Sequence, residues 1–163
     1  VDLYAATKEA FEKIIEFYVK ARRFNVITLE LYDNYGKNDK RRKIMNLLKE
    51  SFLSDKPLKM TLGEQKVDIL YIDDLINAYI VAESQLEGNM GHSKYSLMSE
   101  NKKTLKEIVQ IFKKITNKNL DIEFGTIKYK DREILHPWDK GIKLPNWNAN
   151  ISLEDGIKKF MDM

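Results

Sequence analysis

Two hydrophobic periods follow one another at the start of the chain, and this succession constrains the fold more than any other feature. Residues 3–22 place apolar or aromatic side chains three and four positions apart, which predicts an amphipathic helix. Residues 25–32 are largely β-branched, aliphatic or aromatic, which predicts a strand. Helical spacing returns over residues 41–54. A chain that alternates in this way is expected to be α/β.

The rest of the chain continues the alternation in shorter segments. Further strands are expected at 58–62, 67–71, 94–98 and 120–124, and further helices at 74–86, 104–115 and from residue 152. The stretch 33–40 is rich in Asn, Gly and Asp and is expected to be a loop, and residues 125–150 are expected to be mostly irregular. Asp73 is expected to cap the helix that follows it, while Thr104 and Glu107 have the spacing of a capping box.

Composition excludes several classes of protein. The 163 residues include 28 Lys and Arg against 25 Asp and Glu, a formal charge of +3, and the signs are interspersed, so no nucleic-acid partner is expected. The sequence has no cysteine, which excludes a disulfide scaffold, a thiolate zinc site and a cysteine nucleophile. Its two histidines, His92 and His136, are far apart, so no metal is expected. The longest apolar run, residues 78–82, is too short to cross a membrane, and no signal peptide is found, so we expect a soluble cytoplasmic protein.

Tyr4 and Lys8 stand four residues apart on the first predicted helix and therefore share one of its faces. A tyrosine hydroxyl ordinarily titrates near 10, and a neighbouring ammonium favours the phenolate, which suits such a pair to proton transfer at neutral pH. The same spacing also arises by chance, as a half-buried tyrosine beside a solvated lysine. Taken alone, the pair leaves both interpretations open.

Three later stretches extend this pattern over nearly the whole chain. Residues 30–39 read E-L-Y-D-N-Y-G-K-N-D, residues 63–74 read G-E-Q-K-V-D-I-L-Y-I-D-D, and residues 144–157 read L-P-N-W-N-A-N-I-S-L-E-D-G-I. Together with Y-x-x-x-K on a long helix, and in this order, they resemble the extended short-chain dehydrogenase/reductase family, which contains NAD(P)-dependent nucleotide-sugar epimerases, dehydratases and reductases. The pattern of residues 29–43 most resembles the CDP-abequose and CDP-paratose synthase branch, whose members reduce a 4-keto-dideoxyhexose carried on CDP.

The motifs depart from the family pattern at several positions. Glu30, Asp33 and Lys37 stand where the family usually has Arg, Asn and Pro. Val67 stands where the family often has an Arg that contacts the phosphates of the substrate, and Lys66 is adjacent to it.

The resemblance implies roles for individual residues. Tyr4 would donate a proton to the ketone oxygen at sugar C4, and Lys8 would hold the cofactor ribose and stabilise the phenolate. Residues 31–33, which are Leu31, Tyr32 and Asp33, would pass close to the nicotinamide of NAD or NADP at the end of a strand. The candidate substrate contacts are polar or basic: Asp33, Asn34, Arg41, Arg42, Lys43 and Lys66. The basic residues would meet a nucleotide diphosphate, although a solvated loop and helix start explains them equally.

Several other residues are expected to have structural roles. Asp73 and Asp74 form a pair of adjacent carboxylates, but capping explains them better. Trp138 and Trp147 are expected to pack, with a platform for a nucleobase as the alternative. The two histidines are expected at the surface or in packing.

The resemblance also implies an architecture. The chain is expected to be the C-terminal part of an extended Rossmann-type α/β fold, with residues 1–35 a remnant of the cofactor domain. Residues 36–163 would form mainly a substrate-binding lobe, with a return strand near 67–72. The chain starts at Val1 rather than Met and holds no G-x-G-x-x-G array. We therefore expect the N-terminal nucleotide-binding half to be absent and this chain alone to be inactive and to bind the cofactor weakly.

The expected function is that of the C-terminal portion of a nucleotide-sugar oxidoreductase, which reduces a nucleotide-linked 4-keto-deoxyhexose with NADPH. A 4-epimerase or a dehydratase is the alternative within the family. A non-catalytic substrate-binding or dimerising module is the alternative from another class. The family also implies a homodimer through the helix of Tyr4 and Lys8, in which Phe11, Ile15 and Tyr18 serve either the interface or the sheet.

Overall fold

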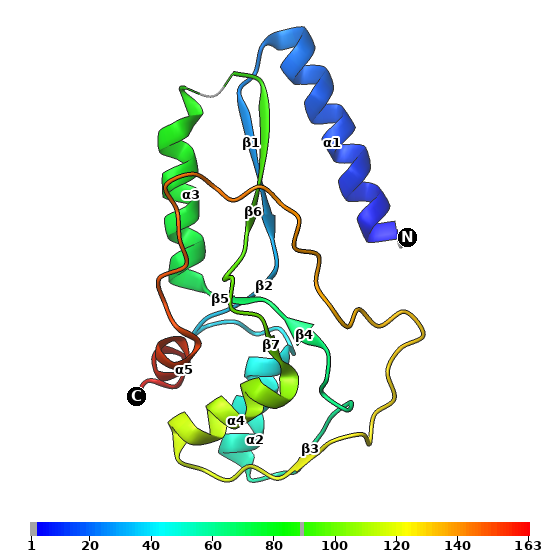
Figure 1. The fold of residues 1–163 in the computed structure, drawn as a ribbon, viewed down its shortest axis with the longest axis vertical. Helices are drawn as coiled ribbons and strands as arrows, with labels where there is room; N and C mark the ends of the chain where they lie inside the picture. Colours follow the sequence, from blue (N-terminus) through cyan, green and yellow to red (C-terminus); the bar gives the residue numbers. More distant parts are fainter. Residues whose placement is uncertain (1–2, 89) are drawn as a thin grey trace.

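The computed structural model describes residues 3–88 and 90–163, so residues 1–2 of the predicted cofactor-domain remnant lie outside the described part. Its helices are α1 (Leu3–Arg22), α2 (Ile44–Ser54), α3 (Ile72–Leu86), α4 (Leu105–Thr116) and α5 (Leu153–Met161). Its strands are β1 (Val26–Leu31), β2 (Asp33–Tyr35), β3 (Leu58–Lys59), β4 (Lys66–Val67), β5 (Ile69–Tyr71), β6 (His92–Leu97), β7 (Lys103–Thr104) and β8 (Ile122–Glu123). The predicted alternation is confirmed, and the fold is α/β (Figure 1).

Two pairs of parallel strands form the centre of the molecule, and β1 leads directly into β2 (Figure 1). β1 pairs with β6, with Val26 opposite His92, and β2 pairs with β5, with Asp33 opposite Ile69. The prediction of a loop from residue 33 is wrong for its first three residues. Pairing with β5 keeps this backbone extended although its composition favours a turn, because tertiary context overrides local propensity in strands.

Two apolar clusters pack against these strands. The first lies between α3 and the β1–β6 pair and includes Leu75, Ala78, Leu97 and Trp147. The second is built mainly from α2, α4, α5 and the β2–β5 pair, and its buried members are Tyr35, Met45, Leu48, Met60, Tyr71, Ile108, Val109, Phe112, Leu120, Ile157 and Phe160. The clusters fix β2 and β5, and with them the strand ends that carry the candidate site residues.

The two tryptophans differ in their surroundings. Trp147 is buried as predicted, and its indole N–H donates a hydrogen bond to the Asp74 carbonyl at 3.1 Å. Trp138 is 55% exposed, so the prediction that it packs is wrong. It lies in the long irregular stretch, where its backbone carbonyl, rather than its ring, accepts a hydrogen bond from Tyr32.

Helix α3 begins earlier than predicted. Tyr71 takes the N-cap position, so the prediction that Asp73 caps the helix is wrong. Because β5 runs directly into the helix, both acidic residues fall in its first turn, where a carboxylate interacts favourably with the helix dipole. Asp73 forms an ion pair with Lys159 at 2.8 Å. The carboxylate of Asp74 accepts hydrogen bonds from the backbone N–H groups of residues 150 and 151 at 3.1 and 2.9 Å.

Helices α4 and α2 begin in contrasting ways. The capping box of α4 is confirmed, because the Glu107 N–H donates to Thr104 Oγ1 at 3.1 Å and the Thr104 N–H donates to Glu107 Oε2 at 2.7 Å. Helix α2 begins at Ile44 rather than at Arg41, and Lys43 occupies its N-cap position without making a side-chain capping bond. The side chain of Lys43 is therefore available for another partner.

Helix α1 lies along the β1–β6 pair and buries none of its described residues (Figure 1). Lys94 of β6 joins it to the sheet, because its ammonium lies 2.9 Å from Glu12 of α1 and 3.3 Å from Glu30 of β1. The large apolar residues that α1 leaves exposed are Leu3, Tyr4, Phe11, Ile14, Phe17 and Tyr18. The helix thus presents an apolar surface to solvent in the described structure.

Candidate functional site

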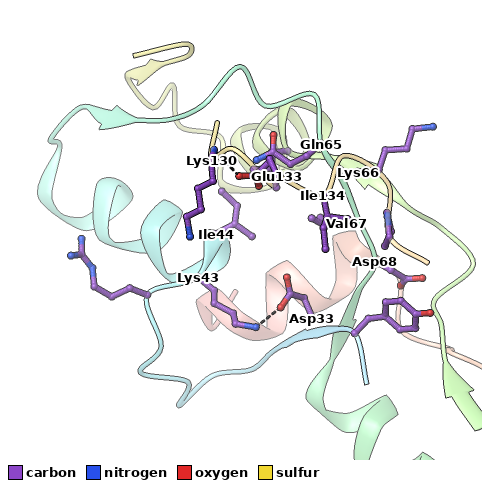
Figure 2. Close-up of a pocket in the computed structure, with 14 residues that line it drawn as sticks. Asp33, Lys43, Ile44, Gln65, Lys66, Val67, Asp68, Lys130, Glu133 and Ile134 are labelled. Carbon is purple, nitrogen blue, oxygen red and sulfur yellow. Dashed lines mark hydrogen bonds and ion pairs between the residues drawn. The ribbon is translucent and has the colours of Figure 1, made fainter. Parts of the chain in front are cut away.

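A cavity of about 560 Å³ opens where β2, β4 and the start of α2 meet the irregular segment 130–137 (Figure 2). Its lining residues come from distant stretches of the chain: Tyr32, Asp33, Arg42, Lys43, Ile44, Gln65, Lys66, Val67, Asp68, Leu105, Lys130, Glu133, Ile134 and Pro137. The structure thus brings together five residues predicted for the site, namely Tyr32, Asp33, Arg42, Lys43 and Lys66. A volume of this size suits a small-molecule ligand.

Two lysines reach into the cavity from different walls (Figure 2). Lys43 forms an ion pair with Asp33. Lys130 extends toward Ile44, and within residues 3–88 and 90–163 its ammonium has no carboxylate within 4 Å. Lys66 lines the same cavity, but its side chain extends away from the other labelled groups (Figure 2). The lining therefore mixes the cations of Arg42, Lys43, Lys66 and Lys130 with the carboxylates of Asp33, Asp68 and Glu133. Of the two lysines that reach into the cavity, Lys130 is the one whose ammonium an anionic ligand could pair with.

Asp68 is the buried carboxylate of the cavity wall, at 2% exposure. Its Oδ1 accepts a hydrogen bond from the Ser99 N–H at 2.9 Å, and its Oδ2 has no hydrogen-bond partner among the described residues. Burial, with the nearby carboxylates of Glu30 and Asp68, raises the pKa of Tyr32 above its ordinary value. Tyr32 therefore stays protonated at neutral pH, and its hydroxyl donates to the Trp138 carbonyl at 2.7 Å.

Sequence reasoning missed the wall of the cavity that comes from the irregular stretch 125–150. The missed residues are Lys130, Glu133, Ile134 and Pro137. The backbone N–H of Lys66 donates to the Leu135 carbonyl at 2.8 Å, which brings this stretch beside β4. A contact between residues so far apart leaves no mark in local spacing or hydrophobic period, so no local signal could have found these residues.

Arg41 and Asn34 lie outside the 560 Å³ cavity and contact one another. The Arg41 guanidinium donates to Asn34 Oδ1 at 2.8 Å and to Asp39 Oδ2 at 2.7 Å. The hydrogen bond from Arg41 lowers the pKa of Asp39 below its ordinary value. Arg41 is thus engaged in holding the loop after β2.

Tyr4 and Lys8 are also not among the residues that line the cavity. They share one face of α1, and the Lys8 ammonium lies 5.5 Å from the centroid of the Tyr4 ring, within the range of a cation–π contact. Tyr4 is 72% exposed, and Leu31 at the end of β1 is 43% exposed. Tyr4 and the end of β1 are therefore accessible to solvent. Of the residues that line the cavity, Tyr32 and Asp33 are the two that directly follow Leu31 in sequence.

Tyr4, Lys8 and the end of β1 are the residues that would hold the nicotinamide end of a dinucleotide. Tyr4 and Lys8 supply a phenol and an ammonium, the donors that a ribose hydroxyl and a reacting carbonyl require, and the carboxyl end of β1 lies open. The pyrophosphate of a dinucleotide is ordinarily cradled by a glycine-rich turn at a helix N-terminus. The sequence contains no such G-x-G-x-x-G turn, so the fit extends to the nicotinamide end alone.

Comparison with known proteins places this arrangement in a family. The family model described as "NAD dependent epimerase/dehydratase family" matches residues 1–95, more than half of the chain. The chain belongs to the NAD-dependent epimerase/dehydratase family. A CDP-abequose synthase of Yersinia pseudotuberculosis is 33% identical over 150 residues, which cover 86% of this chain and 52% of the relative. A CDP-abequose synthase of Salmonella muenchen is 31% identical over 164 residues, which cover 98% of this chain and 55% of the relative.

This epimerase/dehydratase chain therefore spans about half the length of the curated relatives it matches. Solved structures show the same fold at low identity. A UDP-glucuronic acid 4-epimerase from Bacillus cereus, in complex with UDP-glucuronic acid and NAD, has a TM-score of 0.83 at 23% identity, over 98% of this chain and 51% of its own. A UDP-glucose-4-epimerase from Stenotrophomonas maltophila, with bound NAD and formylated UDP-arabinopyranose, has a TM-score of 0.84 at 14% identity. The match covers 98% of this chain and 53% of the epimerase chain.

Residues 3–88 and 90–163 contain no group of three or more His, Cys, Asp or Glu side chains placed to hold a metal ion. No helix within the same ranges is both long and apolar enough to span a membrane. His92 packs with its Nε2 2.8 Å from Thr28 Oγ1, and His136 is exposed, in agreement with the structural roles predicted for them.

Proposed function

We propose that the cavity binds the diphosphate and the sugar of a nucleotide sugar, and that the chain forms part of a nucleotide-sugar oxidoreductase. The observation that carries the proposal is the entry of Lys130, which forms no ion pair with a described residue, into a 560 Å³ cavity whose opposite wall holds the Lys43–Asp33 ion pair (Figure 2). Ammonium groups bind phosphate oxygens as point charges, and the volume is right for a small polar ligand. The CDP-abequose synthases among the relatives favour CDP as the nucleotide.

The reaction we propose is reduction of a nucleotide-linked 4-keto-deoxyhexose. NADPH or NADH would supply the hydride when bound. Tyr4 would donate the proton to the carbonyl oxygen, and Lys8, whose ammonium lies 5.5 Å from the Tyr4 ring centroid, would stabilise the phenolate left behind. A 4-epimerase or a dehydratase would use the same pair, so both reactions remain alternatives to reduction within the proposal.

A second candidate from another class is a non-catalytic module that binds the substrate or dimerises. It is favoured by the 72% exposure of Tyr4, which is not among the residues that line the cavity. In this candidate the cavity binds a nucleotide sugar while the chain performs no chemistry on it. The exposed apolar surface of α1 supports the proposal of a homodimer in either case.

Calorimetric titration with CDP and UDP tests the binding proposal. We expect wild-type protein to bind CDP and Lys130→Gln to bind it about tenfold more weakly, because one ammonium–phosphate contact is lost. Lys114→Gln is the matched control, because it removes the same charge from the exposed face of α4. Equal affinities of the two variants would contradict the assignment of the cavity.

Because the chain alone is expected to be inactive, the catalytic proposal is tested on the full-length protein, by oxidation of NADPH in the presence of a CDP-linked 4-keto-deoxyhexose. We expect Tyr4→Phe to lower turnover at least ~100-fold, as removal of a general acid does, and Tyr79→Phe on the exposed face of α3 to leave it unchanged. Turnover of Tyr4→Phe at the wild-type rate would overturn the role of Tyr4. Ligand binding by wild-type protein without any turnover would favour the non-catalytic module.

A further inference from the structure

We propose that Lys43 neutralises Asp33 in the wall of the cavity, and that this compensation allows an anionic ligand to bind beside a carboxylate. The inference rests on the proposed function, because it concerns the same cavity and takes a nucleotide diphosphate as the ligand. Figure 2 shows the two side chains facing one another across the cavity edge, joined by an ion pair.

Asp33 cannot easily leave the cavity, because its backbone is fixed. It begins β2, opposite Ile69 of β5, and its side chain is 47% exposed toward the cavity it lines. An uncompensated carboxylate at this position would repel a diphosphate and would oppose the attraction of Lys130. Asp68 and Glu133 also line the cavity, and of these three carboxylates Asp33 is the one that a lysine of the described chain pairs with.

Lys43 occupies a position that helix stability does not explain. It is the N-cap residue of α2, with extended φ and ψ of −101° and 171°, and it makes no side-chain capping bond. N-cap positions favour Ser, Thr, Asp and Asn, and a cation at a helix N-terminus is opposed by the helix dipole. The ion pair with Asp33 is also a weak source of stability, because both side chains are more than two-fifths exposed. The positive charge of Lys43 is explained instead by the carboxylate of Asp33 beside it and by the ligand that Lys43 and Asp33 would both face.

The decisive comparison uses Lys43→Ser, Asp33→Asn and the double variant, each titrated with CDP and with inorganic pyrophosphate. We expect Lys43→Ser to weaken CDP binding about 100-fold, which corresponds to about 2.8 kcal/mol. The double variant, which removes both charges, should return to within about fivefold of wild type, and Asp33→Asn alone should bind CDP more tightly than wild type. Lys43→Ser should leave Tm unchanged or raise it by about 2 °C, because serine is a better N-cap.

Lys143→Ser is the matched control. Like Lys43, Lys143 is about two-fifths exposed, at 38%, and pairs with a carboxylate, Glu100, at 2.8 Å, but it lies outside the cavity. We expect this variant to bind CDP within about twofold of wild type.

Four results would overturn the inference, and the last of them would also overturn the proposed function. If the double variant binds as weakly as Lys43→Ser, the lysine contacts the ligand directly and does not compensate Asp33. If Tm and affinity fall together in Lys43→Ser, the role of the lysine is structural. If Lys43→Ser binds CDP as wild type does, the inference alone fails. If wild-type protein binds neither CDP nor pyrophosphate, the proposed function fails as well, so the two failures are distinguishable.

Discussion

At the scale of single residues, the hydroxyl of Tyr35 occupies the space that a side chain at Gly156 of α5 would need. A Cβ at position 156 would lie 2.0 Å from that oxygen and 3.0 Å from the ring carbon Cζ. Tyr35 is 4% exposed and packs edge-to-face on Tyr71 and Phe160, so it cannot withdraw without disturbing the core.

We therefore expect Gly156→Ala to lower the free energy of unfolding by about 2 kcal/mol, although alanine has the higher helix propensity. Urea unfolding measures the change. Gly88→Ala is the control, since the nearest atom to its added Cβ is 3.8 Å away. Equal stabilities of the two variants would show that Tyr35 does not hold this position.

Asp73 and Asp74 are neighbours in sequence with opposite surroundings. Asp74 is 4% exposed and accepts two backbone N–H groups from residues 150 and 151, whereas Asp73 is exposed and pairs with Lys159. We expect Asp74→Asn to cost about 2 kcal/mol, because an amide N–H₂ would face a backbone donor in a buried position. Asp73→Asn should leave stability nearly unchanged. Thermal unfolding of both variants checks this, and a larger loss in Asp73→Asn would contradict the geometry.

At the scale of elements, the irregular segment 128–139 is held against the cavity by two tyrosine hydroxyls. The N–H of Glu64 donates to Tyr129 Oη at 3.1 Å, and Tyr32 donates to the Trp138 carbonyl at 2.7 Å. Between these two bonds lie Lys130 and the other residues of the segment that line the cavity. The position of that wall thus depends on two phenols.

We expect Tyr32→Phe and Tyr129→Phe each to speed trypsin cleavage after Arg132 about fivefold. Loss of one hydrogen bond of about 1 kcal/mol shifts the opening of a segment by that factor. Tyr79→Phe, on the exposed face of α3, should be cleaved at the wild-type rate. Unchanged cleavage of both cavity variants would show that the hydroxyls do not hold the segment.

The elements differ in how far the sequence predicts them. The start of α4 was predictable because Thr104 and Glu107 complete their capping box within four residues. The strand β2 was not, because its extended backbone depends on pairing with β5, more than thirty residues later. The start of α3 was misplaced for a related reason, since β5 runs straight into the helix and moves Asp73 inside it.

The candidate site divides in the same way. Asp33, Arg42 and Lys43 are close in sequence, so a basic and polar stretch after a strand indicated them. Lys130 belongs to a segment without hydrophobic period, and a backbone contact between Lys66 and Leu135 brings it to the site. Such a contact exists only in the folded chain, so sequence reasoning had no means to predict this wall.

At the scale of the whole molecule, α1 differs from an ordinary amphipathic helix because its large apolar side chains are exposed to solvent. Phe11 is 59% exposed and Ile14 53% exposed, and none of the described residues of α1 is buried. If α1 forms the proposed homodimer, wild-type protein sediments as a dimer at micromolar concentration. Phe11→Lys with Ile14→Lys should then yield monomers, while Ile76→Lys, at a 53% exposed position on α3, should not. A monomeric wild-type protein would contradict this proposal.

The central claim is that a nucleotide diphosphate binds in the cavity between β2, β4, the start of α2 and segment 128–139. Amide hydrogen exchange with and without CDP tests it most directly, because it locates the ligand along the chain. The account predicts slower exchange in residues 31–44, 64–68 and 128–139. Unchanged exchange in these three segments, or protection confined to the separate cavity lined by residues 25–29 and 79–86, would contradict it.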